Sequence, residues 1–393
     1  MAQAEQHSEP GERISQIPAL TGVRALAAAL VFFGHVLEPH RTTMPFFIHY
    51  GFTGVDVFFA LSGYLFTYQY ADALIEGTFR WGRYLRRRLI RIYPVTTLVV
   101  IVATISRWEN LNWQNIVLHL TLLHGWFTEY RLRLNGPMWS LTIEESYYLI
   151  APLLISVFAV MWQTISTSRG SWEVSWKHRG AWIAGALGVW WLSAMLSRGM
   201  ALTYQDMLYS FGGVWDSDAS TFTIFGRISE FVAGMCGAIL MRGALPRRKW
   251  IGDVLVVLSI AAYITVSAFI EAEGGEMHVG MHKLGMLALK SYAVIATVGL
   301  MGLHIGGYVT RLLSHPFAIV LGECSFALYI IQFIPIGNSL RAGMDLQSAL
   351  EAYGVAPVPA SLICYTVLNV IAVILYRFFE QPVRRALRTR FAA

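Results

Sequence analysis

Apolar runs of about 20 residues recur along the whole chain, from Leu20 to Phe379. A helix needs roughly 20 mostly apolar residues to cross a bilayer, so this recurrence constrains the fold more than any other feature. The composition agrees, because 55% of the residues are hydrophobic and 14% are charged, against about 25% charged residues in a soluble protein. The sequence therefore predicts an all-α polytopic membrane protein. It excludes a disordered chain, a disulfide scaffold and a large soluble domain on one anchor.

Ten of the apolar runs are long enough to be membrane spans. They lie near residues 19–37, 51–70, 90–106, 138–162, 181–198, 223–241, 251–270, 285–304, 317–336 and 359–379. An eleventh run, 113–127, is short and contains His119 and His124. Its place in the topology has to be decided by the charges of the loops.

The distribution of Lys and Arg favours about ten transmembrane helices with both termini in the cytoplasm. If 113–127 does not cross, the predicted inner segments hold 19 Lys and Arg residues and the outer segments hold seven, as the positive-inside rule requires. A crossing there would move the later basic loops to the other side and weaken the bias. We therefore predict a re-entrant or outer-surface element near 113–137. The net charge of +6 then reflects inner loops and gives no reason to expect a nucleic-acid partner.

The predicted organisation is a single transmembrane domain, residues 17–385, in the inner (plasma) membrane. A polar cytoplasmic tail, 1–16, precedes it and a basic tail, 386–393, follows it. Cys236, Cys324 and Cys364 all lie within apolar runs, and no Cys/His spacing typical of a metal site occurs. No metal is therefore expected. The i,i+5 spacing of His119 and His124 does not place them on one helical face, which argues against a two-histidine metal site. Six residues of the outer segments are interpreted, for the most part, as charges at the outer rim: His40, His49, His119, His124, Arg131 and Arg133.

Several ionisable residues fall inside or at the start of predicted spans, where such residues are costly and usually functional. Arg24 and His35 are 11 residues apart in the first run, roughly 16 Å along one helical face. Asp56 begins the second run, and Glu144 and Glu145 begin the fourth, all on the predicted outer side. Each has an ordinary alternative: snorkelling for Arg24, packing for His35, and a helix-start charge for the carboxylates. Their convergence at one depth favours an active site, with only one of the adjacent glutamates facing it.

Six arginines lie between residues 80 and 91, on the predicted cytoplasmic side. Ordinary positive-inside charge and anionic lipid headgroups explain such a cluster. The other inner loops carry four or fewer basic residues, however, and guanidinium groups match the geometry of phosphate. The cluster therefore also suggests a clamp for a phosphate-bearing ligand.

The motifs taken together resemble one family, the acyltransferase-3 family of integral membrane O-acyltransferases. The similar elements are Arg24-x10-His35; Gly54-Val55-Asp56-x-Phe58-Phe59-x-Leu61-Ser62-Gly63; Arg88-x-x-Arg91-x-x-Pro94; Trp139-Ser140-Leu141-x-x-Glu144; Arg227-x-x-Glu230; and Glu380-x-Pro382. The resemblance runs from about Ile17 to Arg385. One position that is often histidine in the family is Gln332 here.

The resemblance implies transfer of an acyl group, most often acetyl, from cytosolic acyl-CoA to a hydroxyl of an extracytoplasmic or lipid-linked carbohydrate. It implies that His35 is a general base or a transient acyl carrier, and that Asp56 or Glu144 orients it. The residues expected to hold the donor are Arg24, Arg83, Arg87, Arg88 and Arg91, and those expected at the substrate are Ser62, Trp139 and Ser140. Acetyl-CoA, the acceptor glycan and the lipid bilayer are the expected partners.

Two other classes of function remain open on the sequence. A transporter or flippase for an acyl or glycolipid substrate would also have about ten spans and intramembrane charges, although no inverted repeat supports it. A membrane receptor or scaffold would leave His35 and the arginine cluster unexplained. Only the enzyme would consume a thioester and release free CoA.

Overall fold

The computed structural model describes residues 17–40, 42–107, 111–165, 179–210, 219–242, 248–274, 283–334 and 342–391. The predicted N-terminal tail, 1–16, and residues 166–178 of the predicted inner loop lie outside these ranges. Within them every regular element is a helix, so the predicted all-α class is confirmed.

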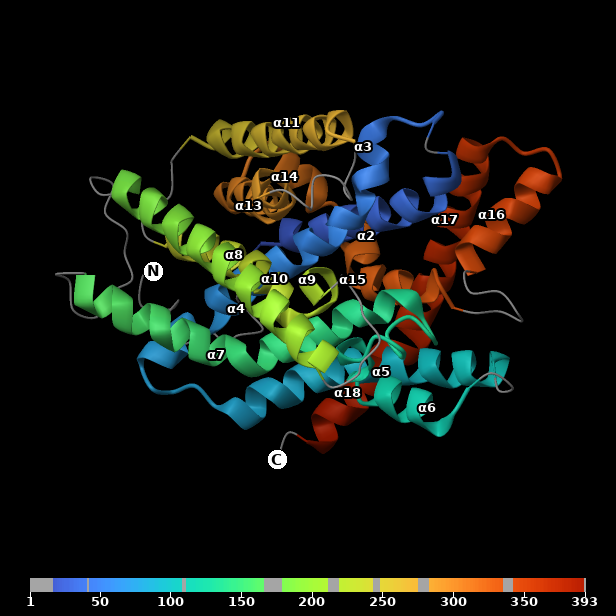
Figure 1. Cartoon of the computed structure of the whole chain (residues 1–393), viewed down its shortest axis with the longest axis horizontal. Helices are drawn as coiled ribbons and strands as arrows, with labels where there is room; N and C mark the ends of the chain where they lie inside the picture. The colour runs from blue at the N-terminus through green and yellow to red at the C-terminus, as the bar shows by residue number, and fades with distance from the viewer. Residues whose placement is uncertain are drawn as a thin grey trace.

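Long helices occupy the positions of all ten predicted spans (Figure 1). They are α2 (Ala19–Val36), α4 (Gly54–Ile75), α5 (Trp81–Ser106), α7 (Trp139–Ile165), α8 (Arg179–Ser210), α10 (Ile224–Leu240), α11 (Trp250–Ala272), α13 (Lys283–Ile305), α15 (Pro316–Ile331) and α17 (Pro357–Leu375). By length and hydropathy the described residues contain seven candidate membrane spans. The helices α7, α10 and α15 are not among them, and α10 and α15 have only 17 and 16 residues. The chain is thus a multi-pass membrane protein, and ten crossings stay a prediction.

Shorter helices connect or extend the long ones. They are α3 (Phe46–His49), α6 (Trp113–Leu120), α9 (Ala219–Phe222), α14 (Tyr308–Leu313), α16 (Ala342–Ala352) and α18 (Gln381–Arg390), with 3₁₀ turns η2 (Glu38–His40), η3 (Tyr50–Thr53), η5 (His124–Trp126) and η6 (Gly136–Met138) and a π-helical turn η8 (Tyr376–Glu380).

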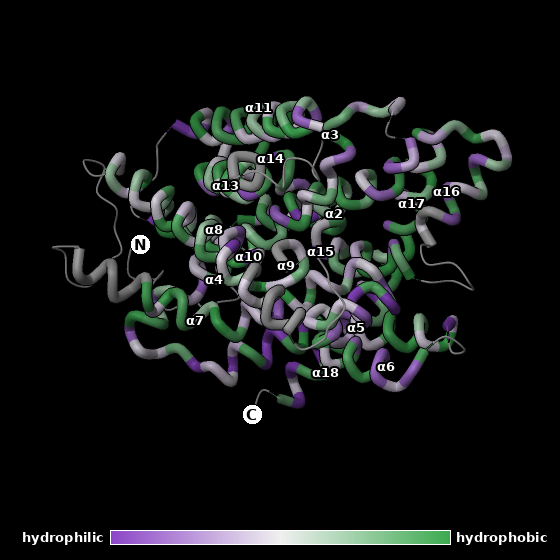
Figure 2. Tube along the Cα trace, viewed as in Figure 1, coloured by the Kyte–Doolittle hydropathy of each residue, from purple (hydrophilic) through white to green (hydrophobic). Residues whose placement is uncertain are grey.

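Hydrophobic side chains cover the outside of the helix bundle as well as its interior. Val257, Leu258 and Ile260 of α11 are each more than half exposed, and Figure 2 shows α11 hydrophobic along most of its length. In contrast, every residue of α10 from Ser229 to Ile239 is buried. This pattern is typical of a protein whose outer helices face lipid and whose inner helices pack around a site.

Glycines bring the central helices into backbone contact. A Cβ atom on Gly234 of α10 would lie 1.8 Å from the carbonyl oxygen of Ala60 in α4, and one on Gly63 would lie 2.1 Å from that of Phe231. Gly322 of α15 meets the carbonyl of Thr21 in the same way. Small residues allow membrane helices to pack this closely, so α4 and α10, and likewise α2 and α15, form rigid pairs.

The contacts between helices fix their relative directions. Ser62 bonds Glu144, and Phe66, one turn later in α4, contacts Tyr147 in α7. The later residue of α4 contacts the later residue of α7, so the two helices run in the same direction. Asp56–Arg227 and Asp72–Arg242 show the same for α4 and α10. These directions are the ones that the ten-crossing prediction requires.

The ambiguous segment 113–137 folds as short pieces between α5 and α7. Its helix α6 has eight residues, about 12 Å in length, which is well under a bilayer's hydrocarbon thickness of roughly 30 Å. The segment continues through η5 and η6, and α6 packs against α5 while η5 packs against α7. This geometry agrees with a re-entrant or surface element. If α6 crossed, α7 would run opposite to α4.

Candidate active site

A cavity of about 60 Å³ lies among α2, α4, α5, α7 and α15, with room for roughly four or five water molecules. Its polar lining residues are Arg24, Ser62, Arg88, Arg91, Ser140, Glu144, Tyr148 and Tyr329. Six of these belong to the set predicted from the sequence: Arg24, Ser62, Arg88, Arg91, Ser140 and Glu144. Three arginines face one carboxylate, so the lining favours an anionic ligand.

The α7 wall of the cavity carries Ser140, Glu144 and Tyr148 at four-residue spacing, which places them on one helical face over about 12 Å. Ser62 donates a hydrogen bond to Glu144 Oε1 at 3.0 Å, and the Tyr148 hydroxyl donates to the same oxygen. Arg88 Nη1 donates to the Tyr148 hydroxyl at 3.4 Å, and its guanidinium lies 4.5 Å from the centre of the Tyr148 ring. Glu144 is thereby linked through Tyr148 to Arg88.

The structure separates the two adjacent glutamates. Glu144 lines the cavity, whereas Glu145 accepts a hydrogen bond from the Tyr93 hydroxyl at 3.1 Å, between α5 and α7. Only one of them faces the site, as their angular separation on the helix predicts.

Arg24 points into the cavity from the second turn of α2. Its Nε donates to Ser325 Oγ of α15 at 3.3 Å. The guanidinium therefore lies between two packed helices, which disfavours the alternative that Arg24 snorkels at the helix end.

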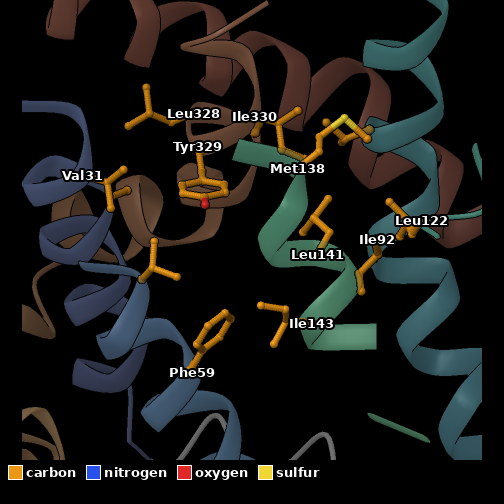
Figure 3. Close-up of a cluster of buried hydrophobic side chains, with 14 of the residues drawn as sticks. Val31, Phe59, Ile92, Leu122, Met138, Leu141, Ile143, Leu328, Tyr329 and Ile330 are labelled. Carbon is orange, nitrogen blue, oxygen red and sulfur yellow. The ribbon is translucent and has the colours of Figure 1, made fainter. Parts of the chain in front are cut away.

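His35 lies beyond the cavity, further along the same helix. Its ring packs edge-on against Phe333 with centroids 5.0 Å apart, and Phe333 comes four residues after the cavity-lining Tyr329. Figure 3 shows the Tyr329 ring between Val31 of α2 and the start of α7. His35 Nδ1 is 2.7 Å from the Val31 carbonyl oxygen, which can only accept a hydrogen. In the neutral ring Nδ1 therefore carries the hydrogen and Nε2 keeps the lone pair of a base.

Asp56 belongs to a buried network of charges at the start of α4. Arg227 of α10 pairs with Asp56 at 2.7 Å and with Glu230 at 3.3 Å, and Lys290 of α13 pairs with Glu230 at 2.8 Å. The network is neutral as a whole and joins three helices. Asp56 adjoins the cavity through its neighbour Val55, which lines it.

Lys290 is the member of this network that the sequence reasoning missed. It is buried and lies inside the predicted span 285–304, so the rule that singled out Arg24 would also have found it. The remaining predicted residues lie outside the cavity lining. Trp139 stacks edge-on against Phe222 at 4.9 Å, while Arg83 is exposed on α5 and Arg87 is half-buried there.

The interpretation as rim charges is wrong for His119, His124 and Arg131, which are buried, whereas Arg133 is exposed. His119 and His124 are buried, and their rings stack with centroids 4.1 Å apart. The i,i+5 argument failed because α6 ends at Leu120, so that η5 folds His124 back onto His119. Burial lowers the pKa of His119 from 6.5 to about 4 and that of His124 as well. Among the described residues no group of three His, Cys, Asp or Glu could hold a metal ion.

Comparison with known proteins agrees with the motif pattern. The family model described as an acyltransferase domain (Acyl_transf_3) matches residues 17–378. The acyltransferase MdmB of Streptomyces mycarofaciens is 26% identical over 96% of this chain and 94% of its own length. The peptidoglycan O-acetyltransferase OatA of Listeria monocytogenes is 24% identical over 94% of this chain and 56% of its own. A putative O-acetyltransferase of Staphylococcus aureus (strain COL) is 23% identical over 95% and 58%.

The chain thus spans a little over half the length of the staphylococcal and Listeria relatives and nearly all of MdmB. No solved structure matches the chain. Since the family model covers nearly the whole sequence, and the cavity gathers residues from four of the family's motifs, the protein belongs to the acyltransferase-3 family.

Proposed function

We propose that this protein transfers an acyl group, acetyl in the first place, from cytosolic acyl-CoA to a hydroxyl of an extracytoplasmic or lipid-linked carbohydrate. The observation that carries the proposal is the cavity, which is lined by three arginines and lies beside α2, the helix that carries His35 further along. Family membership makes the protein an acyltransferase. The donor, the acceptor and the residue roles are our inference.

The arginine end suits a phosphate-bearing donor. Arg88 and Arg91 lie near the start of α5 and Arg24 near the start of α2, on the predicted cytoplasmic side. Arginine forms paired, charge-assisted hydrogen bonds with phosphate. From this end a pantetheine arm would extend along Glu144 toward Ser140 and Tyr329. The names of the staphylococcal and Listeria relatives, which are O-acetyltransferases, favour acetyl as the acyl group.

The opposite end suits the reaction. His35 Nε2 would accept the proton of the acceptor hydroxyl while the hydroxyl oxygen forms a bond with the thioester carbonyl carbon. The carbon–sulfur bond then breaks, and the thiolate of CoA takes up the proton. In a covalent alternative, Nε2 attacks the thioester carbon and the CoA thiolate leaves as the carbon–sulfur bond breaks. The acceptor hydroxyl then attacks the acylated ring, the carbon–nitrogen bond breaks, and the proton of the hydroxyl passes to the thiolate. Asp56 would hold Arg227 in place, and Glu144 would hold Arg88 through Tyr148.

The course of the helices supports delivery of the acyl group across the membrane. Arg24–Ser325 and His35–Phe333 show that α2 and α15 run in parallel, so the cavity lies between the arginine end and the His35 end of one helix pair. The name of the Listeria relative, a peptidoglycan O-acetyltransferase, supports a glycan acceptor. The cytoplasmic (inner) membrane is the location that this proposal requires, because the donor is cytosolic and the acceptor is outside.

Purified protein in nanodiscs, given acetyl-CoA labelled in the acetyl group and a panel of glycan acceptors, tests the proposal. We expect release of free CoA and transfer of label to the glycan. The His35→Ala variant should be slower by about 10²- to 10⁴-fold, the usual contribution of a general base. His40→Ala is the matched control, because His40 pairs with Glu351 at the same end of α2 without approaching the cavity.

Full activity of a folded His35→Ala protein would overturn the role of His35. A transporter would move the labelled compound between the two sides of a vesicle and leave the thioester intact. That result would overturn the proposed function as a whole.

A further inference from the structure

The C-terminal helix α18 extends the last span beyond the reach of the bilayer. Residues Pro357–Arg390 form a nearly continuous helical stretch of 34 residues, about 50 Å long against roughly 30 Å of hydrocarbon. The final part, α18, carries Arg384, Arg385, Arg388 and Arg390. It packs against α5, and Arg86 donates to the carbonyl of Phe391. Figure 1 shows α18 beside α5 near the C-terminus.

The arginines of α18 lie close to the arginine end of the cavity. The charge of the cavity-lining Arg91 acts on both Glu380 and Arg384, and the charge of Arg388 acts on Arg384. Glu380 bonds Arg384 at 2.9 Å. Within the described part of the chain, Arg91 and Arg388 have no ion-pair or hydrogen-bond partner. Arg388 thus lies near Arg384, and Arg91 and Arg384 both lie near the Glu380 carboxylate, on which the charge of Glu323 also acts.

The π-helical turn η8 explains how this carboxylate comes to be there. It inserts an extra residue between α17 and α18 and ends at Glu380, which is 1% exposed. Glu380 Oε2 is buried with no hydrogen-bond partner. Turns of this kind often occur at functional sites. Here the turn fixes Glu380, and Glu380 in turn fixes Arg384 one helical turn later.

We propose that α18 forms the second wall of the donor's phosphate site, with Arg384 and Arg388 binding phosphate groups of the CoA moiety opposite Arg91. The inference rests on the proposed function, since it names where the same donor's nucleotide end binds. A nucleotide with several phosphates needs more than one cationic wall, and α5 alone supplies one. Glu380 acts as a positioning residue for Arg384. An anionic lipid headgroup has the same phosphate chemistry, and the experiment separates the two.

The test measures the Kd of CoA and of dephospho-CoA, which lacks the ribose phosphate, for protein in phosphatidylcholine nanodiscs. For Arg384→Ala/Arg388→Ala we expect CoA binding at least tenfold weaker and a smaller difference between the two ligands. Arg385→Ala/Arg390→Ala is the matched control, because it removes the same charge from the same helix and should leave both Kd values within twofold. Arg384→Lys/Arg388→Lys keeps the charge without the guanidinium fork, so its Kd for CoA should lie between those of wild type and the double-alanine variant.

Unchanged CoA binding by a folded Arg384→Ala/Arg388→Ala protein would overturn the inference, even if wild-type protein transfers acetyl groups. If the variant differs from wild type only in nanodiscs that contain phosphatidylglycerol, α18 binds lipid headgroups and the inference is again overturned. Weaker CoA binding by the variant, together with no acyl transfer by wild type, would support the α18 site and contradict the proposed function.

Discussion

The adjacent residues Glu144 and Glu145 of α7 have different surroundings, and only Glu144 is placed where it could contact a ligand in the cavity. Glu144 lies in the cavity with Ser62 and Tyr148 on one oxygen, whereas Glu145 lies against Tyr93. The sequence could predict that one carboxylate faces the site, because that follows from 100° per residue. It could not predict which one, because the answer depends on where α4 and α5 pack.

The first prediction compares these two glutamates. Glu144→Gln keeps the shape of the side chain and removes its charge beside the donor path, so we expect a 10- to 100-fold lower kcat for acetyl transfer. Glu145→Gln should stay within threefold of wild type, since the hydrogen bond to Tyr93 can form with an amide oxygen. Steady-state kinetics of both variants under saturating acetyl-CoA provide the measurement. Equal losses would show that Glu144 has no special place in the reaction.

The sequence predicted the cavity residues better than the residues around it. Arg24, Ser62, Arg88, Arg91, Ser140 and Glu144 were all expected at the site because each is a polar or charged residue within a motif. The pairing of Asp56 with Arg227 could not be foreseen, because these residues are 171 positions apart and meet only through the packing of α4 on α10.

At the scale of elements, backbone contact through glycine holds the central helices together. The second prediction is that Gly234→Val lowers the free energy of unfolding by about 1–3 kcal/mol, the usual cost of overpacking, because even a Cβ would meet the Ala60 carbonyl at 1.8 Å. Gly185→Val in α8 is the control, since nothing lies within 4 Å of a Cβ there. Thermal unfolding in detergent checks both. A stable Gly234→Val protein would contradict the tight packing of α4 on α10.

The stacked histidines make the α6–η5 element sensitive to acid. The pKa of His119 is about 4 in the folded protein and 6.5 in the unfolded chain. Below pH 6.5 the unfolded chain therefore takes up a proton that the folded protein does not, and stability falls until about pH 4.

The third prediction is that the free energy of unfolding falls by about 2 kcal/mol between pH 7.5 and pH 5 because of His119 alone. The His119→Phe/His124→Phe variant keeps two stacked rings and removes both titrations. Its melting temperature should fall less over the same pH range than that of wild type. A parallel fall in both proteins would mean that other groups cause the acid sensitivity.

For the whole molecule, hydropathy and loop charge predicted the helix positions well. Each of the ten predicted runs contains a long helix, because apolar length alone dictates where a chain can cross. The buried histidine pair escaped prediction, because it depends on a chain reversal after α6 that no periodicity reveals.

The fourth prediction concerns the orientation in the membrane. Cysteine at the exposed position Thr121 should react with an impermeant reagent in intact cells, whereas cysteine at the exposed positions Thr78 and Thr389 should react only after permeabilisation. The background should be low, because Cys236, Cys324 and Cys364 are buried. Labelling of Thr389→Cys from outside while Thr78→Cys stays protected would contradict an even number of crossings between the two positions.

The glycine contacts around the cavity also set the calibre of the acyl path. The backbone of α4 contacts that of α10, and the backbone of α2 contacts that of α15. The helices that line the cavity therefore cannot move apart to admit a longer acyl chain without separating these helix pairs. Any widening has to come from side chains, and the phenylalanines at the lining are Phe58, Phe59 and Phe326. If the protein acts as proposed, we expect smaller side chains at these positions to admit longer acyl chains within a fixed frame, so an enzyme of this architecture could change its donor range without changing its fold.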